Sequence, residues 1–186
     1  NEFLQIKPVI KDDPSPVDPP MTGKISFSHA SFTYRHTGIK AIQDFTLDIS
    51  PGEKLAIVGR TGSGKSTLAQ LMLRMYDLDE GDLKYDNVPI KKIRLDTLRR
   101  KISYVPQDVF LFSDTIRNNI AFGQENLEMK DIMEAARQAS IAEEIGQLPQ
   151  GFETMVGERG VTLSGGQKQR ISIARALVKN PQIVVF

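Results

Sequence analysis

One nine-residue segment restricts the folds open to this chain more than any other part of the sequence. Residues 59–67 read Gly-Arg-Thr-Gly-Ser-Gly-Lys-Ser-Thr and fit the pattern G-x-x-x-x-G-K-S/T. The apolar run at residues 54–58 before it predicts a strand of a parallel sheet that is buried on both faces. The helix expected after it, over residues 67–76, has an apolar stripe formed by Leu68, Leu71, Met72 and Met75. This order of strand, glycine-rich loop and helix predicts an α/β fold.

The residue types in this loop are suited to holding a nucleotide. Its glycines allow close backbone approach, and the amide groups at the start of the helix point at phosphate oxygens. Lys65 supplies a positive charge for the β- and γ-phosphates, and the Ser66 hydroxyl is a ligand for a metal ion. The predicted nucleotide-binding residues are Gly59, Arg60, Thr61, Gly62, Ser63, Gly64, Lys65, Ser66 and Thr67.

A second and rarer motif, Leu163-Ser164-Gly165-Gly166-Gln167, begins the helix expected over residues 165–179. Ser164 is a favourable N-cap residue, and the two glycines let a ligand approach the positive end of the helix. We therefore expect a second anion site here. The alternative is a helix cap that binds no ligand.

Together the two motifs resemble the ATPase cassettes of the ABC superfamily, and the resemblance covers residues 24–186. It implies an α/β fold: a P-loop NTPase parallel sheet flanked by helices, an N-terminal antiparallel β region and an inserted helical subdomain at about 110–165. It also implies ATP and Mg²⁺ as cofactors. In that family the second motif, here Leu163 to Gln167, closes the ATP site of a second ABC ATPase domain in a homo- or heterodimer.

The resemblance assigns roles to two further residues. Gln107, in Tyr104-Val105-Pro106-Gln107-Asp108, stands in place of the catalytic glutamine that positions water and Mg²⁺, so Ser66 and Gln107 are the expected metal-binding residues. Tyr34 matches the aromatic residue that stacks on adenine. From its chemistry alone, an aromatic side chain at this spacing in a strand fits a core position equally well.

Two segments are similar to those of exporter-type members of the family. They are residues 156–160 and residues 110–120, and they imply contact with a transmembrane domain through Glu158, Arg159 and the Gln107 region. Taken alone, Glu158 and Arg159 are equally well explained as a solvated charge pair. The domain is then expected at the cytoplasmic face of the cell membrane.

Residues 1–22 contain five of the ten prolines and several charged residues. Such a stretch favours extended, poorly hydrogen-bonded backbone. We expect a linker from an upstream membrane domain, followed by the ATPase domain at residues 23–186; a disordered tail is the alternative.

The remaining pattern predicts strands at Ile25 to Tyr34, 39–49, 101–105 and 183–186, a hairpin at 81–88, and helical structure over 115–148. His29 and His36 have no ligand-like spacing. The family places its metal-binding and catalytic carboxylates directly after the last of these strands, so we expect ATP hydrolase activity in the complete protein and negligible turnover by the chain as given.

These observations predict the ATP-binding domain of an ABC exporter, which couples ATP binding, head-to-tail dimerisation and hydrolysis to transport. A soluble ABC ATPase and a non-catalytic ATP-binding dimerisation module are the alternatives. The formal net charge of +1 gives no electrostatic reason to expect a nucleic-acid partner. The absence of cysteine excludes disulfides and thiolate metal sites.

Overall fold

The computed structural model describes residues 8–124, 126–157 and 162–186. The chain forms two compact units, of which the first ends at Arg99 and the second begins at Arg100. Glu158 and Arg159 lie outside the described residues, as does the first third of the expected linker. Within the described residues, no helix is long and apolar enough to cross a bilayer.

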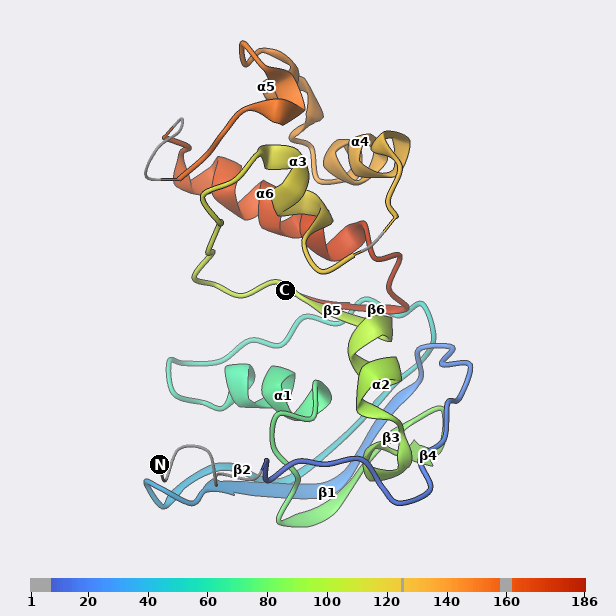
Figure 1. Ribbon diagram of the computed structural model, residues 1–186. Helices are drawn as coiled ribbons and strands as arrows, with labels where there is room; N and C mark the ends of the chain where they lie inside the picture. The colour runs from blue at the N-terminus through green and yellow to red at the C-terminus, as the bar shows by residue number, and fades with distance from the viewer. Residues whose placement is uncertain (1–7, 125, 158–161) are drawn as a thin grey trace, which may run out of the picture. The chain divides into compact units, whose positions relative to one another are not determined.

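The first unit contains a four-stranded antiparallel sheet in the order β2-β1-β3-β4 (Figure 1). Its strands are β1 (Ile25–Tyr34), β2 (Ile39–Ile49), β3 (Glu80–Tyr85) and β4 (Val88–Pro89). The predicted alternation in β1 is confirmed, because Ile25, Phe27 and Phe32 are buried. A bulge at His29, whose φ is 48°, shifts the register and brings Ala30 into the core as well.

The hairpin between β3 and β4 turns at Asp86 and Asn87, as the sequence predicts. Both residues have positive φ, 49° and 68°, which is the backbone of a type I′ turn. The twist of such a turn matches that of the strands it joins.

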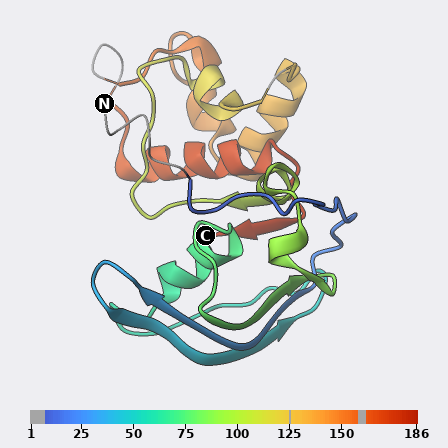
Figure 2. The ribbon, with the colours of Figure 1, turned by 60° about the horizontal axis from the view of Figure 1, so that its bottom comes forward.

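Helix α1 (Lys65–Met72) lies over one face of this sheet (Figures 1 and 2). It is shorter than predicted, since Arg74 adopts a left-handed backbone with φ 48°. The Arg74 amide donates to the Leu71 carbonyl and the Met75 amide to the Gln70 carbonyl, which is a Schellman motif. The expected place of Met75 on the apolar stripe is therefore wrong, and its side chain is 54% exposed.

The strand predicted at residues 54–58 does not form. Among the described residues, no segment pairs with it in a β-ladder, and the Val58 side chain is 90% exposed. Apolar composition predicts that a segment prefers burial, but a strand also requires a neighbouring backbone to satisfy its N–H and C=O groups. The sequence pattern carries no information about that neighbour.

The N-terminal segment is better ordered than expected. The Val17 amide donates to the Lys92 carbonyl at 2.8 Å, and the Val17 carbonyl accepts from the Arg94 amide at 3.0 Å. These bonds form a parallel bridge beside the short helix η2 (Ile90–Lys92) and the start of α2 (Leu95–Lys101). The expectation of poorly hydrogen-bonded backbone is thus wrong here, because backbone and carboxylate partners for this segment lie in the folded unit.

The second unit combines a two-stranded parallel sheet, formed by β5 (Ile102–Tyr104) and β6 (Ile183–Val185), with helices. The helices are α3 (Ile116–Ala121), α4 (Met129–Gln138), α5 (Ala142–Gly146), the 3-10 helix η3 (Gly151–Glu153) and α6 (Gly165–Leu177). Helices α3 and α4 pack on α6 around a core that includes the fully buried Ile171 (Figure 1). The two sheets and the helices confirm the predicted α/β class.

The pKa of Asp86 gives the first prediction. Its partial burial raises this pKa, but hydrogen bonds from the Thr22 hydroxyl and from the amides of Thr22, Gly23 and Lys24 outweigh that effect and hold it below the ordinary range. The stabilisation is therefore present above the unfolded-state pKa, and it is lost as the pH falls through the folded-state pKa. We expect Asp86→Asn to lower the free energy of unfolding by about 1 kcal/mol at pH 7, and by less at pH 3, which is below the ordinary carboxyl pKa of 3.8.

Urea unfolding at the two pH values tests this prediction. Asp44→Asn, at an exposed position on β2, is the matched control. An Asp86→Asn effect that is equal at both pH values would contradict the assignment.

Candidate functional site

The glycine-rich loop before α1 has a backbone that only glycine adopts readily. Gly62 and Gly64 have φ of 80° and 89°, in the left-handed region. Gly64 also lies against β2, where an added Cβ atom would come within 2.5 Å of the Ala41 carbonyl oxygen. The Ser63 amide closes the loop by donating to the Arg60 carbonyl at 3.2 Å. These constraints leave the loop exposed and place its end at the N-terminus of α1.

The charge around the loop favours an anion. Lys65 donates from Nζ to the carbonyl oxygens of Gly59 and Arg60 at 2.8 and 2.9 Å, so its ammonium group lies over the loop. The first turn of α1 carries no acidic residue, and the N-terminal amides of a helix attract negative charge. The Ser66 hydroxyl is exposed, whereas Thr67 is buried. The loop residues thus fit a nucleotide phosphate chain with its Mg²⁺ ion.

Tyr34, at the end of β1, is brought to this same helix. Its hydroxyl lies 3.0 Å from Thr67 Oγ1 and donates to Gln70 Oε1 at 2.8 Å. Its half-buried ring contacts Phe32 and Tyr76 edge-on. The structure therefore brings Tyr34 and the loop helix together, while stacking on a base stays a prediction.

The second motif forms the N-terminus of α6 in the second unit. Ser164 is the N-cap: its Oγ accepts from the Gln167 amide at 3.2 Å, and its own amide donates to Gln167 Oε1 at 2.9 Å. This reciprocal pair is a capping box. Gly165 and Gly166 are exposed in the first turn, and an added Cβ at Gly165 would meet no atom within 4 Å. The buried Leu163 anchors the motif in the core.

Glu144 on α5 fixes this helix from the side. Its carboxylate accepts from Gln167 Nε2 at 3.1 Å and from an Arg170 guanidinium nitrogen at 2.5 Å. The Gln167 side chain is therefore occupied at both ends, by Ser164 and by Glu144. The Ser164 hydroxyl only accepts in this arrangement, so its O–H remains available to a ligand, together with the backbone amides and the open space above the glycines.

Gln107 follows β5 and is exposed. Because β5 and β6 are parallel, residues beyond their carboxyl ends lie at one edge of the sheet, which is where ligands bind in α/β proteins. Gln107 and the second motif lie in the second unit, and Tyr34 and the loop lie in the first. Among the described residues, no group of three or more acidic or histidine side chains is placed to hold a metal ion.

The sequence reasoning missed two residues that organise the surface near Gln107. Asn119 is buried; its amide side chain bonds both the N–H and the C=O of Phe112 and accepts from the Arg175 guanidinium at 2.9 Å. Arg175 also donates to the Phe110 and Asn119 carbonyls, and partial burial lowers the pKa of its guanidinium. An asparagine and an arginine 56 positions apart give no spacing signal in sequence.

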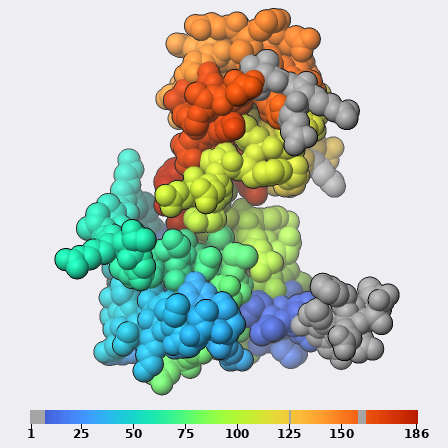
Figure 3. All heavy atoms as spheres, turned by 90° about the vertical axis from the view of Figure 1, so that its left-hand side faces the viewer, coloured from blue at the N-terminus to red at the C-terminus, as the bar shows by residue number. Residues whose placement is uncertain are grey.

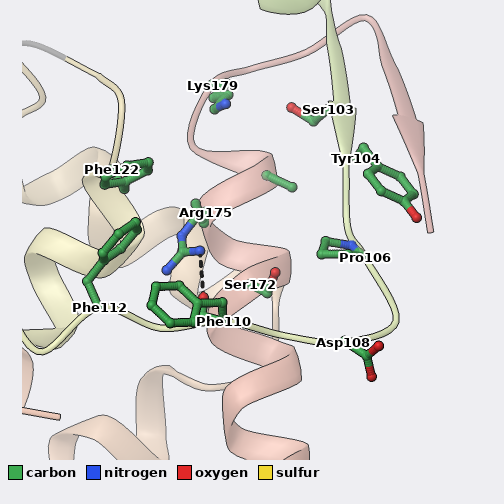
Figure 4. Close-up of a pocket in the computed structure, with 11 residues that line it drawn as sticks. Ser103, Tyr104, Pro106, Asp108, Phe110, Phe112, Phe122, Ser172, Arg175 and Lys179 are labelled. Atoms are coloured by element: carbon green, nitrogen blue, oxygen red, sulfur yellow. Dashed lines mark hydrogen bonds between the residues drawn. The ribbon is translucent and has the colours of Figure 1, made fainter. Parts of the chain in front are cut away.

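Arg175 lines a cavity of about 250 Å³ (Figure 4). Phe110, Phe112 and Phe122 surround the Arg175 guanidinium, and the Phe110 side chain is 66% exposed. Tyr104, Pro106 and Asp108 extend the lining along the segment that contains Gln107. Exposed aromatic groups around a held cation are typical of a surface that binds another protein.

Comparison with known proteins was made for the whole chain. Residues 42–186 match the ABC transporter family. The chain is 50% identical over 166 residues to the uncharacterized ABC transporter ATP-binding protein YfiB of Bacillus subtilis, covering 89% of the chain and 29% of that protein. It is 45% identical over its whole length to the probable multidrug resistance ABC transporter ATP-binding/permease protein YheI of the same organism, of which it covers 32%.

A solved structure agrees with these matches. The structure of a bacterial Atm1-family ABC exporter with ATP bound superposes with a TM-score of 0.91 at 39% identity, over 98% of this chain and 32% of that one. The chain thus spans about a third of the length of the proteins it matches.

The loop geometry gives the second prediction. Gly64→Ala should destabilise the first unit by several kcal/mol, since the new Cβ atom would combine left-handed strain with a clash against Ala41. Gly62→Ala is the matched control, because Gly62 has a similar φ of 80° and open space around it. Thermal unfolding of both variants measures the difference, and equal losses would show that contact with β2 does not constrain the loop.

Proposed function

The chain belongs to the ABC transporter family, and we propose that it is the ATP-binding domain of an exporter, with ATP hydrolysis coupled to transport. The observation that carries this proposal is the presence of two exposed helix N-termini built for anions: the P-loop before α1 and the capped motif of α6. The first has a lysine, Lys65, directed at it. The second has the form expected of a surface that meets a phosphate held by another domain.

In this proposal the P-loop residues hold Mg·ATP. The Lys65 ammonium exchanges its contacts with the Gly59 and Arg60 carbonyls for the β- and γ-phosphates, and the N-terminal amides of α1 bind the remaining phosphate oxygens. Tyr34 stacks on the adenine, with its hydroxyl held by α1. The Ser66 hydroxyl would be the ligand from the loop for Mg²⁺, which would supply positive charge beside the phosphates. Gln107 is the residue proposed to position the metal and the attacking water.

Residues 163–167 then contribute to the ATP site of a second domain. The cap keeps the first turn of α6 in place, so its amides are preorganised and their positive electrostatic potential faces outward. Two such domains that pair head to tail enclose two nucleotides. The capped motif therefore makes dimerisation part of the proposed catalytic cycle.

The surface around Arg175 is the proposed contact with the transmembrane domain. Phe110, Phe112 and Phe122 provide exposed aromatic area beside the segment that contains Gln107. If ATP binding moves that segment, the transmembrane domain packed on these rings moves with it. Glu158 and Arg159 are proposed as further contacts of the same partner. With such a partner, the proposed location of the domain, residues 23–186 with its linker at 1–22, is the cytoplasmic face of the cell membrane.

Nucleotide binding by the P-loop is the third prediction. Saturating Mg·ATP should stabilise the chain, by about 2.7 kcal/mol at a concentration 100 times Kd. Lys65→Ala should abolish this gain with little change in the melt without nucleotide, since the Lys65 ammonium group bonds only its own loop within the described residues. A variant that is still stabilised by Mg·ATP would place the nucleotide elsewhere.

Dimerisation through the capped motif is the fourth prediction. Gly165→Ala should leave the fold and ATP affinity unchanged, because the added Cβ atom meets nothing within 4 Å in the chain. It should reduce ATP-dependent dimerisation, since the methyl group occupies the approach to the helix N-terminus. Gly146→Ala, in α5 with equally open surroundings, is the control. Sedimentation with Mg·ATP measures the dimer, and equal dimer formation in both variants would argue against this interface.

A further inference from the structure

Residues 11–18, here called the strap, lie against the first unit between the end of α1 and the start of α2. Figure 3 shows this N-terminal segment as dark-blue spheres on the body of the unit. It is held by the parallel bridge between Val17 and Ile93, in which both the N–H and the C=O of Val17 form backbone hydrogen bonds. The strap is thus hydrogen-bonded to the domain by its backbone as well as by its side chains.

Three aspartates of the strap each bind a different group near α2. Asp12 accepts from the Leu95 amide, the first of that helix, at 2.7 Å. Asp13 pairs with Lys92 at 2.8 Å, and this bond, together with the Ser15 amide, keeps the pKa of Asp13 below its ordinary value. Asp18 accepts from Arg94 Nε at 3.0 Å and from the Thr97 hydroxyl. The three carboxylates therefore hold the strap to residues 92–97.

The strap is joined to the P-loop helix through Arg74. This residue follows the C-terminus of α1 in the Schellman motif, and it is only 4% exposed. Its guanidinium donates to the Lys11 carbonyl of the strap at 3.0 Å and to Asp77 at 3.1 Å. A charge so deeply buried requires such partners, so the helix end and the strap are held in one arrangement.

A second connection runs through the end of β3. The buried Tyr85 hydroxyl donates to the Met72 carbonyl in the last turn of α1 at 2.9 Å. The next residue, Asp86, binds the hydroxyl and amide of Thr22 and the amide of Lys24, just beyond the strap. The chain before β1 is therefore tied to the C-terminal end of α1 at two places.

We propose that Arg74 is a positioning residue that couples the strap to the P-loop, so that Mg·ATP at the N-terminus of α1 and strap docking at its C-terminus stabilise each other. The inference rests on the proposed nucleotide binding. Helix α1 has eight residues, about 12 Å of rigid length, so a shift at its first turn is carried to Arg74. Because coupling between sites is reciprocal, strain applied to the segment upstream of the strap alters nucleotide affinity.

Hydrogen exchange of the full chain, followed by mass spectrometry of peptides from residues 11–18, tests the coupling. The Val17 amide, bonded to the Lys92 carbonyl, is the main reporter. We expect saturating Mg·ATP to slow its exchange about fivefold or more in the unaltered chain, within the usual range for coupled sites. Lys65→Ala should show no such change. Titration with a fluorescent ATP analogue measures binding separately.

Arg74→Met separates a positioning role from a structural one. If Arg74 carries the coupling, Mg·ATP still binds the variant, but its affinity falls by the factor by which nucleotide slows strap exchange in the unaltered chain. Exchange of the strap in the variant then no longer responds to nucleotide. A purely structural role would raise exchange equally with and without nucleotide and leave the response intact. Arg137→Met, which removes an arginine from an exposed pair with Glu134, is the matched control. Arg74→Lys replaces Arg74→Met if the methionine variant does not fold.

The outcomes are distinguishable. Absence of nucleotide binding overturns the proposed function and the coupling with it. Binding by the unaltered chain without slower exchange at Val17 overturns the coupling alone. A preserved response in Arg74→Met and Arg74→Lys overturns the assignment to Arg74.

Discussion

The fixed position of helix α1 is the constraint on which the rest of the first unit depends. The Tyr34 hydroxyl contacts Thr67 and Gln70 in its first two turns, and the Tyr85 hydroxyl donates to the Met72 carbonyl in its last turn. Gly64 allows its N-terminus to approach β2 more closely than any side chain would permit. An eight-residue helix is too short to be stable alone, so these contacts supply the order that its own hydrogen bonds cannot.

In the second unit, helix α6 is likewise fixed by contacts with the elements around it. This long helix presents a capped N-terminus, and its middle is buried by α3 and α4 around Ile171. Arg175, in the last turn of α6, donates to Asn119 and to the Phe110 carbonyl. One helix therefore carries the proposed nucleotide-facing end and the proposed partner-facing surface. Because the helix is rigid, a displacement at its N-terminus is carried to the surface around Arg175.

Local patterns in the sequence predicted local structure well. The hairpin at 81–88, the Ser164 cap and the strand at 183–186, which the structure forms at Ile183–Val185, were all predicted, because each depends on a few adjacent residues. The end of helix α1 before Arg74 was not predicted. Glycine in a sequence indicates a left-handed residue that ends a helix, whereas an arginine in that conformation gives no such indication.

Long-range contacts were the part that sequence could not supply. The apolar run at 54–58 predicted a strand for which the described residues provide no partner. The proline-rich strap was expected to be loosely held, yet its aspartates meet Lys92, Arg94 and the α2 amide about 80 positions away. In the site, the P-loop and the capped motif were identified by their residue types. Asn119 and Arg175 could not be identified in this way, because their role depends on a contact between residues that lie 56 positions apart in the sequence.

The capping box of α6 has a consequence for how this motif recognises a ligand. Ser164 Oγ accepts from the Gln167 amide, and the Gln167 side chain bonds the Ser164 amide and Glu144. The Ser164 hydroxyl hydrogen and the backbone dipoles of the first turn are then left to attract an anion. Such dipoles act at the exposed end of a helix, and dissolved ions screen them. In the proposed dimer, closure on a partner's phosphate therefore weakens as ionic strength rises, whereas the hydrogen bonds of the cap are made within the helix itself.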